Sequence, residues 1–238
     1  VRGAFLRDSG YSLRGVRDAL DDLLHLRGAS TDRVAAHVAT LAPRCGLDPH
    51  DVRALVEFLR PSTAERATGQ RSPEALYHVL LQLLSHEAEK QPLVLLLDDL
   101  HFGGTETGQF LEFLAVELQQ HPVPLAVIAS VLTGDVTATR FADVLRRLSR
   151  YEGEGVVRHA LLPLGPSDAE TLIRSIVKLA PDVRASLIQR AAGNEMHLVQ
   201  LARYLVDRKL LTHTNEGWRP RPGVRVDELL PPSLAELV

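Results

Sequence analysis

Two runs of hydrophobic residues mark the middle of the chain. Residues 93–97 (Leu-Val-Leu-Leu-Leu) are all apolar, and residues 122–130 contain a second apolar segment. A run without alternation is typical of a strand in a parallel sheet that is covered on both faces. The segment between the two runs has hydrophobic residues at helical spacing, namely Phe110, Leu111, Leu114 and Leu118. The pattern predicts a strand, a helix and a second strand joined by a right-handed crossover, with helices on both faces of the sheet.

Helical periodicity dominates the chain before residue 93. It predicts four helices, whose ends are marked by glycine or proline. Asp48 followed by Pro49 predicts a helix start, because an N-cap residue then precedes proline at the first helical position. The helix before it is predicted to end ahead of Pro43. Residues 1–6 predict a further strand.

The spacing of the hydrophobic residues changes again after the second apolar run. Residues 156–162 predict another strand, and the pattern is helical from Pro163 onward. Ser167 with Glu170 three residues later predicts a capping box at a helix start. Gly193 predicts the end of a helix, and Asn194 predicts the cap of the next one.

The sequence therefore predicts an α/β protein in three parts. Residues 1–162 form a core around a parallel sheet flanked by helices, residues 163–211 form a small all-α subdomain, and residues 212–238 form a linker with a turn or hairpin and the start of another domain. The first and last residues fall inside predicted elements, so we expect the sequence to be a segment of a longer protein.

The amino-acid composition argues against several classes of function. The net charge of -3 gives no support for nucleic-acid binding, and the positive charge is almost all arginine because only three lysines occur. The single cysteine, Cys45, excludes an internal disulfide framework and a cysteine-based zinc site, which favours a cytoplasmic location. No apolar run is long enough to cross a membrane, and the chain does not begin with a signal peptide.

The main chemical candidate is the acidic pair that follows the first apolar run. Ligands of open α/β sheets gather at the carboxyl ends of the strands, where Asp98 and Asp99 are predicted to lie. One carboxylate there can hold Mg²⁺, and its neighbour can orient an attacking water. The alternative is a plain cap at the end of a strand, since Asp is common where a strand turns into a loop.

Three segments give the chain a family resemblance. Residues 93–102 resemble a Walker B strand continuing in Asp-Asp-Leu-His, and Gly193 with Asn194 resembles the start of a Gly-Asn-Pro lid motif. Residues 229–238 resemble the segment that leads from such a lid into a winged-helix domain. On these segments the chain resembles the ATPase module of the STAND class (Orc1-like AAA type) among the P-loop NTPases, as found in multidomain bacterial regulators.

The resemblance implies an ATP and Mg²⁺ site in the full-length protein. Asp98 would be the Mg²⁺ ligand, Asp99 the carboxylate that orients water, and His101 a second catalytic residue. The predicted all-α subdomain would be the lid over the nucleotide. The implied partners are the nucleotide and effector domains of the same chain (kinase, cyclase or helix-turn-helix), with oligomerisation on activation and no direct contact with nucleic acid or membrane.

For the other residues at the implied site, a local structural role is the alternative to a nucleotide contact. Ser130 ends the second strand and would reach a γ-phosphate or its water, but its hydroxyl can equally satisfy a nearby backbone group. Gly193 and Asn194 would contact the base, although a helix stop and a helix cap explain both. His101 can equally be a loop residue with a local hydrogen bond.

The chain departs from the family pattern at several positions. It has no G-x-x-x-x-G-K-[ST] segment, so the Walker A loop that would hold the phosphates is missing, either by truncation or by loss. Gly104 stands where the family's Walker B continuation has Asp, Leu132 lies near the place of a phosphate-sensing arginine, and Glu195 replaces the lid proline.

Three functions therefore stay open. The first is an ATP-binding regulatory switch module of a larger signalling or transcription-regulating protein, with slow hydrolysis if any. The second is a degenerate, nucleotide-free scaffold for protein contacts, which the departures favour. The third is a phosphoacceptor receiver domain, which needs a lysine after a later strand, whereas Lys178 falls in a predicted helix.

Overall fold

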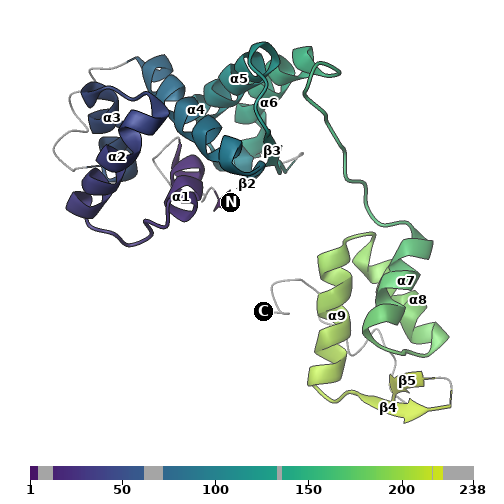
Figure 1. The fold of residues 1–238 in the computed structure, drawn as a ribbon. Coiled ribbons are helices and arrows are strands. Elements are labelled where there is room, and N and C mark those ends of the chain that lie inside the picture. Colours follow the sequence, from purple (N-terminus) through teal and green to yellow (C-terminus); the bar gives the residue numbers. More distant parts are fainter. Residues whose placement is uncertain (5–12, 62–71, 133–135, 216, 222–238) are drawn as a thin grey trace. The chain divides into compact units, whose positions relative to one another are not determined.

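The computed structural model of the chain describes residues 1–4, 13–61, 72–132, 136–215 and 217–221, and of residues 136–141 the backbone alone. The described residues form two compact units, residues 1–158 and residues 159–238. The first unit is α/β and the second is mainly helical. Both units are drawn in Figure 1.

A small parallel sheet lies in the first unit. It contains β1 (Arg2–Ala4), β2 (Leu93–Asp98) and β3 (Leu125–Ala129), with β2 in the centre. Leu93 pairs with Leu125 and Leu97 pairs with Ala129. The predictions of a central parallel strand at residues 93–97 and of its neighbour at residues 125–129 are confirmed.

The sheet is covered on one face, which corrects the prediction of helices on both faces for the described residues. Leu93, Leu95 and Leu97 are buried, whereas Val94 is 44% exposed and Ile128 is 56% exposed. The strand order explains this. Because β1, β2 and β3 follow one another across the sheet, two right-handed crossovers place their helices on the same face.

Six α-helices accompany the sheet in the described part of the first unit. They are α1 (Arg14–Leu23), α2 (Thr31–Cys45), α3 (Pro49–Leu59), α4 (Pro73–Lys90), α5 (Thr105–Gln120) and α6 (Val136–Leu148). The four helices predicted before β2 are thus present, and α2 and α3 pack side by side (Figure 1). One hydrophobic core joins the helices to the buried face of β2.

At the helix ends, one sequence prediction is confirmed and another is wrong. Asp48 accepts hydrogen bonds from His50 N (2.7 Å) and Asp51 N (2.8 Å), and the Asp51 carboxylate accepts one from Asp48 N, so α3 begins with a capping box as well as Pro49. The predicted stop before Pro43 is wrong, since α2 continues to Cys45. A proline in the last turn removes few helical hydrogen bonds, so the helix tolerates it there.

Helix α1 lies directly against strand β1. A Cβ added at Gly3 would stand 1.7 Å from the carbonyl oxygen of Gly15, so only glycine fits at position 3. The contact brings the helix backbone against the strand backbone and fixes α1 on the covered face.

Arg60 holds the end of α3 to α1 and to the loop that follows α1. Its guanidinium donates to both carboxylate oxygens of Asp21 (2.9 Å each) and to the carbonyl oxygens of Leu26 (2.6 Å) and Ala29 (3.0 Å). The side chains of Arg60 and Asp21 are only 18% and 15% exposed. This ion pair is therefore largely buried.

The described residues of the second unit form three helices and a hairpin. The helices are α7 (Pro166–Ile176), α8 (Pro181–Ala191) and α9 (Glu195–Asp207), and the hairpin pairs β4 (Leu211–Thr214) with β5 (Gly217–Pro220). They share a separate hydrophobic core. The hairpin is bonded to the segment between α7 and α8, since Ala180 N donates to Trp218 O (2.9 Å) and Trp218 N donates to Lys178 O (2.8 Å).

Two further sequence predictions fail in this part of the chain. The strand predicted at residues 156–162 is absent: Val156 forms only an isolated bridge with Glu152, and Val157, Leu161 and Leu162 are almost fully exposed. An apolar run forms a strand only beside a partner strand, and these residues have none in the described part of the chain. The predicted capping box of Ser167 and Glu170 is also absent, because α7 starts at Pro166 and Glu170 pairs instead with Arg174 and Arg184.

Among the residues that the structure describes, no helix is long and apolar enough to span a membrane.

Candidate functional site at the carboxyl end of the sheet

The carboxyl ends of β2 and β3 are joined through Ser130. Its hydroxyl donates to Asp98 Oδ1 (2.5 Å) and accepts a hydrogen bond from Asp99 N (3.0 Å). Its backbone continues the ladder, because Ser130 N donates to Leu97 O and Leu100 N donates to Ser130 O. The structure therefore brings three predicted site residues, Asp98, Asp99 and Ser130, to one point of the sheet edge.

A residue from β1 completes this group. Arg2 Nη2 donates to Asp98 Oδ2 at 2.5 Å. The strand register explains the contact, since Arg2 pairs with Leu96 and so lies on the same face as Leu96 and Asp98. Both carboxylate oxygens of Asp98 are thus occupied, one by a hydroxyl and one by a guanidinium.

These contacts stabilise the charged form of Asp98. The hydrogen bond from Ser130, and after it the bond and the charge of Arg2, hold the pKa of the Asp98 carboxyl below its ordinary value. The carboxylate is therefore negatively charged at neutral pH and is the electrostatic centre of the site.

Asp99 has a different environment. Its backbone is left-handed (φ 56°), a conformation that glycine adopts with less strain than any other residue. Its side chain is exposed, and no hydrogen bond or ion pair reaches its carboxylate from the described residues. Asp99 thus presents a solvated carboxylate next to the bonded carboxylate of Asp98.

His101 lies just below this edge and is buried. Its Nδ1 accepts a hydrogen bond from Leu132 N (3.2 Å), and its ring contacts that of Phe102. The imidazole therefore ties the turn after β2 to the segment after β3. The geometry gives His101 a positioning role for that segment, and its predicted catalytic role stays a prediction.

The last two predicted site residues lie in the second unit. Asn194 Oδ1 accepts a hydrogen bond from His197 N (2.9 Å), so Asn194 caps α9 as the sequence predicts. Gly193 has a positive φ of 81°, and a Cβ there would lie 2.6 Å from Pro163 Cβ. Both residues have local structural roles within the second unit.

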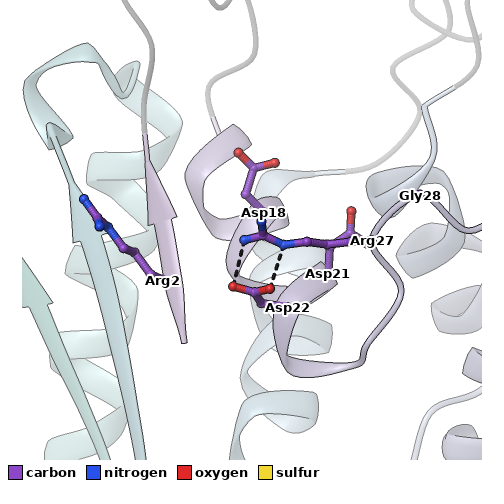
Figure 2. Close-up of a pocket in the computed structure, with 6 residues that line it drawn as sticks. All are labelled: Arg2, Asp18, Asp21, Asp22, Arg27 and Gly28. Atoms are coloured by element: carbon purple, nitrogen blue, oxygen red, sulfur yellow. Dashed lines mark hydrogen bonds and ion pairs between the residues drawn. The ribbon is translucent and has the colours of Figure 1, made fainter.

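A pocket of about 470 Å³ lies beside the start of β1. Its lining residues are Arg2, Asp18, Asp21, Asp22, Arg27 and Gly28. Figure 2 shows the Arg27 guanidinium facing the Asp22 carboxylate, whereas the Arg2 side chain extends away from the three aspartates. Since Asp21 is paired with Arg60 and Asp22 with Arg27, most of the negative charge of this pocket is already neutralised.

The donor atoms at the end of β2 suit a hard cation. The carboxylates of Asp98 and Asp99 and the Ser130 hydroxyl are oxygen donors, which Mg²⁺ prefers. Among the described residues, no three His, Cys, Asp or Glu side chains are grouped to hold a metal by themselves. A divalent cation at Asp98 would thus keep several waters or take oxygens from a bound phosphate, as Mg²⁺ commonly does.

Arg2 is the site residue that the sequence did not reveal. The apolar character of residues 1–6 predicts a strand but not its pairing register, and only the register brings Arg2 to Asp98. Comparison of the chain with known protein families, with curated protein sequences and with solved structures gave no match.

Proposed function

We propose that this chain is part of an ATP-binding regulatory switch in a larger signalling or transcription-regulating protein, as in the STAND-class modules that it resembles. The observation that carries the proposal is the grouping of Asp98, Asp99 and Ser130 at the carboxyl ends of two adjacent parallel strands. Ligands of parallel α/β sheets bind at such ends.

The two carboxylates have distinct parts in this proposal. Asp98, kept charged by Ser130, is the side chain that would hold Mg²⁺, and the cation would neutralise phosphate charge. Asp99 has an exposed carboxylate and would orient a water molecule. A left-handed aspartate in place of glycine supports a use for that carboxylate, since strained backbone positions cluster at functional sites.

The proposal is tested by titrating the chain with MgATP and following backbone amide NMR signals. Weak, saturable shifts are expected at residues 97–101 and 130–132, because the sequence has no glycine-rich phosphate loop with lysine. Asp98→Ala should abolish these shifts. Asp182→Ala is the control, since Asp182 is an exposed aspartate that pairs with Arg219 at 3.4 Å in the other unit. Shifts that persist in Asp98→Ala contradict the proposal.

Hydrolysis is tested separately in the full-length protein. Asp99→Asn should retain MgATP binding and lower turnover, because positioning of the nucleophile matters mainly in the transition state. Equal loss of binding and turnover would contradict the role of Asp99.

A second candidate function is a nucleotide-free scaffold for protein contacts. The Arg2 guanidinium favours it, because this group already supplies positive charge at Asp98. The same MgATP titration separates the two candidates, since a scaffold shows no saturable shifts at the sheet edge.

A further inference from the structure

Arg2 and Asp98 form a pair at the position where a cation would bind. The guanidinium occupies Asp98 Oδ2, and the Ser130 hydroxyl occupies Oδ1. If the guanidinium leaves, Ser130 still orients the carboxylate and Oδ2 becomes available. The geometry therefore separates the two oxygens into one that is held within the sheet and one that can change its partner.

The Arg2 bond is of the kind that can be exchanged. The Arg2 side chain is 67% exposed and has no other hydrogen bond or ion pair with a described residue. An exposed ion pair stabilises a protein by about 1 kcal/mol or less. A divalent cation and a guanidinium also repel each other, so both are not stable on one exposed carboxylate oxygen.

We propose that Arg2 is a resident counterion of Asp98 that opposes divalent-cation binding, so that a cation binds at Oδ2 only when the guanidinium leaves. The inference rests on the cation-binding role of Asp98 in the proposed function and adds its regulation. Because linkage is reciprocal, any contact that draws Arg2 away strengthens cation binding, and cation binding releases Arg2.

The test uses Mn²⁺ alone as the probe, since it shares the preference of Mg²⁺ for oxygen ligands and broadens nearby NMR signals. The variant is Arg2→Gln. The matched control is Arg27→Gln, because the Arg27–Asp22 pair has nearly the same exposure (64% and 36%) as the Arg2–Asp98 pair (67% and 35%). The measured quantity is the Mn²⁺ concentration that half-broadens the amide signals of Asp98, Asp99 and Ser130.

Arg2→Gln should bind Mn²⁺ about two- to fivefold more tightly at these residues, the range that an exposed ion pair allows. Arg27→Gln should leave this affinity unchanged, and adding Asp98→Asn to Arg2→Gln should remove the broadening. Arg2→Lys, which keeps the positive charge, should have nearly the same Mn²⁺ affinity as the natural protein. Hydrogen exchange at Leu96 N, which donates to Val1 O (2.9 Å), shows whether β1 is still paired in each variant.

Two results would overturn the inference. They differ in whether the cation-binding role of Asp98 is refuted as well. Equal Mn²⁺ affinity at Asp98 in the natural protein and in Arg2→Gln refutes the counterion and leaves the cation role of Asp98 standing. Absence of broadening at Asp98, Asp99 and Ser130 in both proteins refutes both, because removal of the guanidinium then creates no cation site.

Discussion

Ser130 and Asp98 are linked across two strands by a 2.5 Å hydrogen bond from the hydroxyl to Oδ1. This bond is the largest single cause of the lowered pKa of Asp98. Ser130→Ala should therefore raise the Asp98 pKa toward its ordinary value. Carboxyl ¹³C NMR over a pH titration measures the change. Ser149→Ala is the control, because the Ser149 hydroxyl donates to Arg146 O (2.9 Å).

The same bond makes stability depend on pH. A carboxyl whose pKa is lower in the folded state contributes stability above its unfolded pKa, near 3.9, and that contribution is lost as the pH falls through the folded pKa. Ser130→Ala should thus be less stable than the natural protein at pH 7, and the difference should shrink below about pH 4. Urea unfolding at both pH values measures this, and a difference that grows in acid would be inconsistent with it.

Asp99→Gly should leave the stability of the first unit unchanged or raise it by up to about 1 kcal/mol, because glycine adopts a positive φ without strain. Asp143→Gly is an informative comparison, since Asp143 lies within α6, and glycine there should cost about 0.3–0.5 kcal/mol in helix propensity and also removes the exposed pair with Arg146. Urea denaturation gives both values. A loss of stability in Asp99→Gly similar to that in Asp143→Gly would show that the Asp99 backbone is not strained.

Arg60→Ala should destabilise the first unit by about 2–4 kcal/mol, since it removes the guanidinium that pairs with the Asp21 carboxylate and that donates to the Ala29 carbonyl group in a largely buried place. Arg27→Ala breaks an exposed pair and should cost less than about 1 kcal/mol. Denaturant midpoints compare the two. Equal effects would mean that the burial of the Arg60 pair contributes nothing.

The two hydrophobic cores should respond separately to mutation. Leu83 and Leu201 are both fully buried, the first in the core of residues 1–158 and the second in that of residues 159–238. Leu83→Ala and Leu201→Ala should each cost about 2–5 kcal/mol. Native-state hydrogen exchange should show the loss only in the unit that carries the substitution. Equal loss of protection in both units would mean that they unfold together.

The sequence predicts most elements of the fold because their signals are local. The apolar run at residues 93–97, the helical spacing after it and the cap at Asp48 depend on neighbouring residues alone. Coverage of the sheet depends instead on strand order, which no local pattern contains. The prediction of a strand at residues 156–162 is wrong for a related reason. An apolar run forms a strand only when a partner strand offers hydrogen bonds, and no such strand lies beside it among the described residues.

The residues of the candidate site were likewise only partly predictable from the sequence. Asp98, Asp99 and Ser130 are predicted to lie together because parallel strands end at one edge, and the structure brings them together. Arg2 was not predicted, because its role depends on which residue of β2 lies beside it.

The contact between Gly3 and Gly15 determines how a displacement can travel through this unit. No side chain fits between the two backbones at position 3, because a Cβ there would stand 1.7 Å from the carbonyl oxygen of Gly15. A displacement of α1 would therefore press directly on β1 next to Arg2, whose guanidinium binds Asp98. It would also disturb the hydrophobic core, because Val16, Ala19 and Leu20 of α1 are fully buried there.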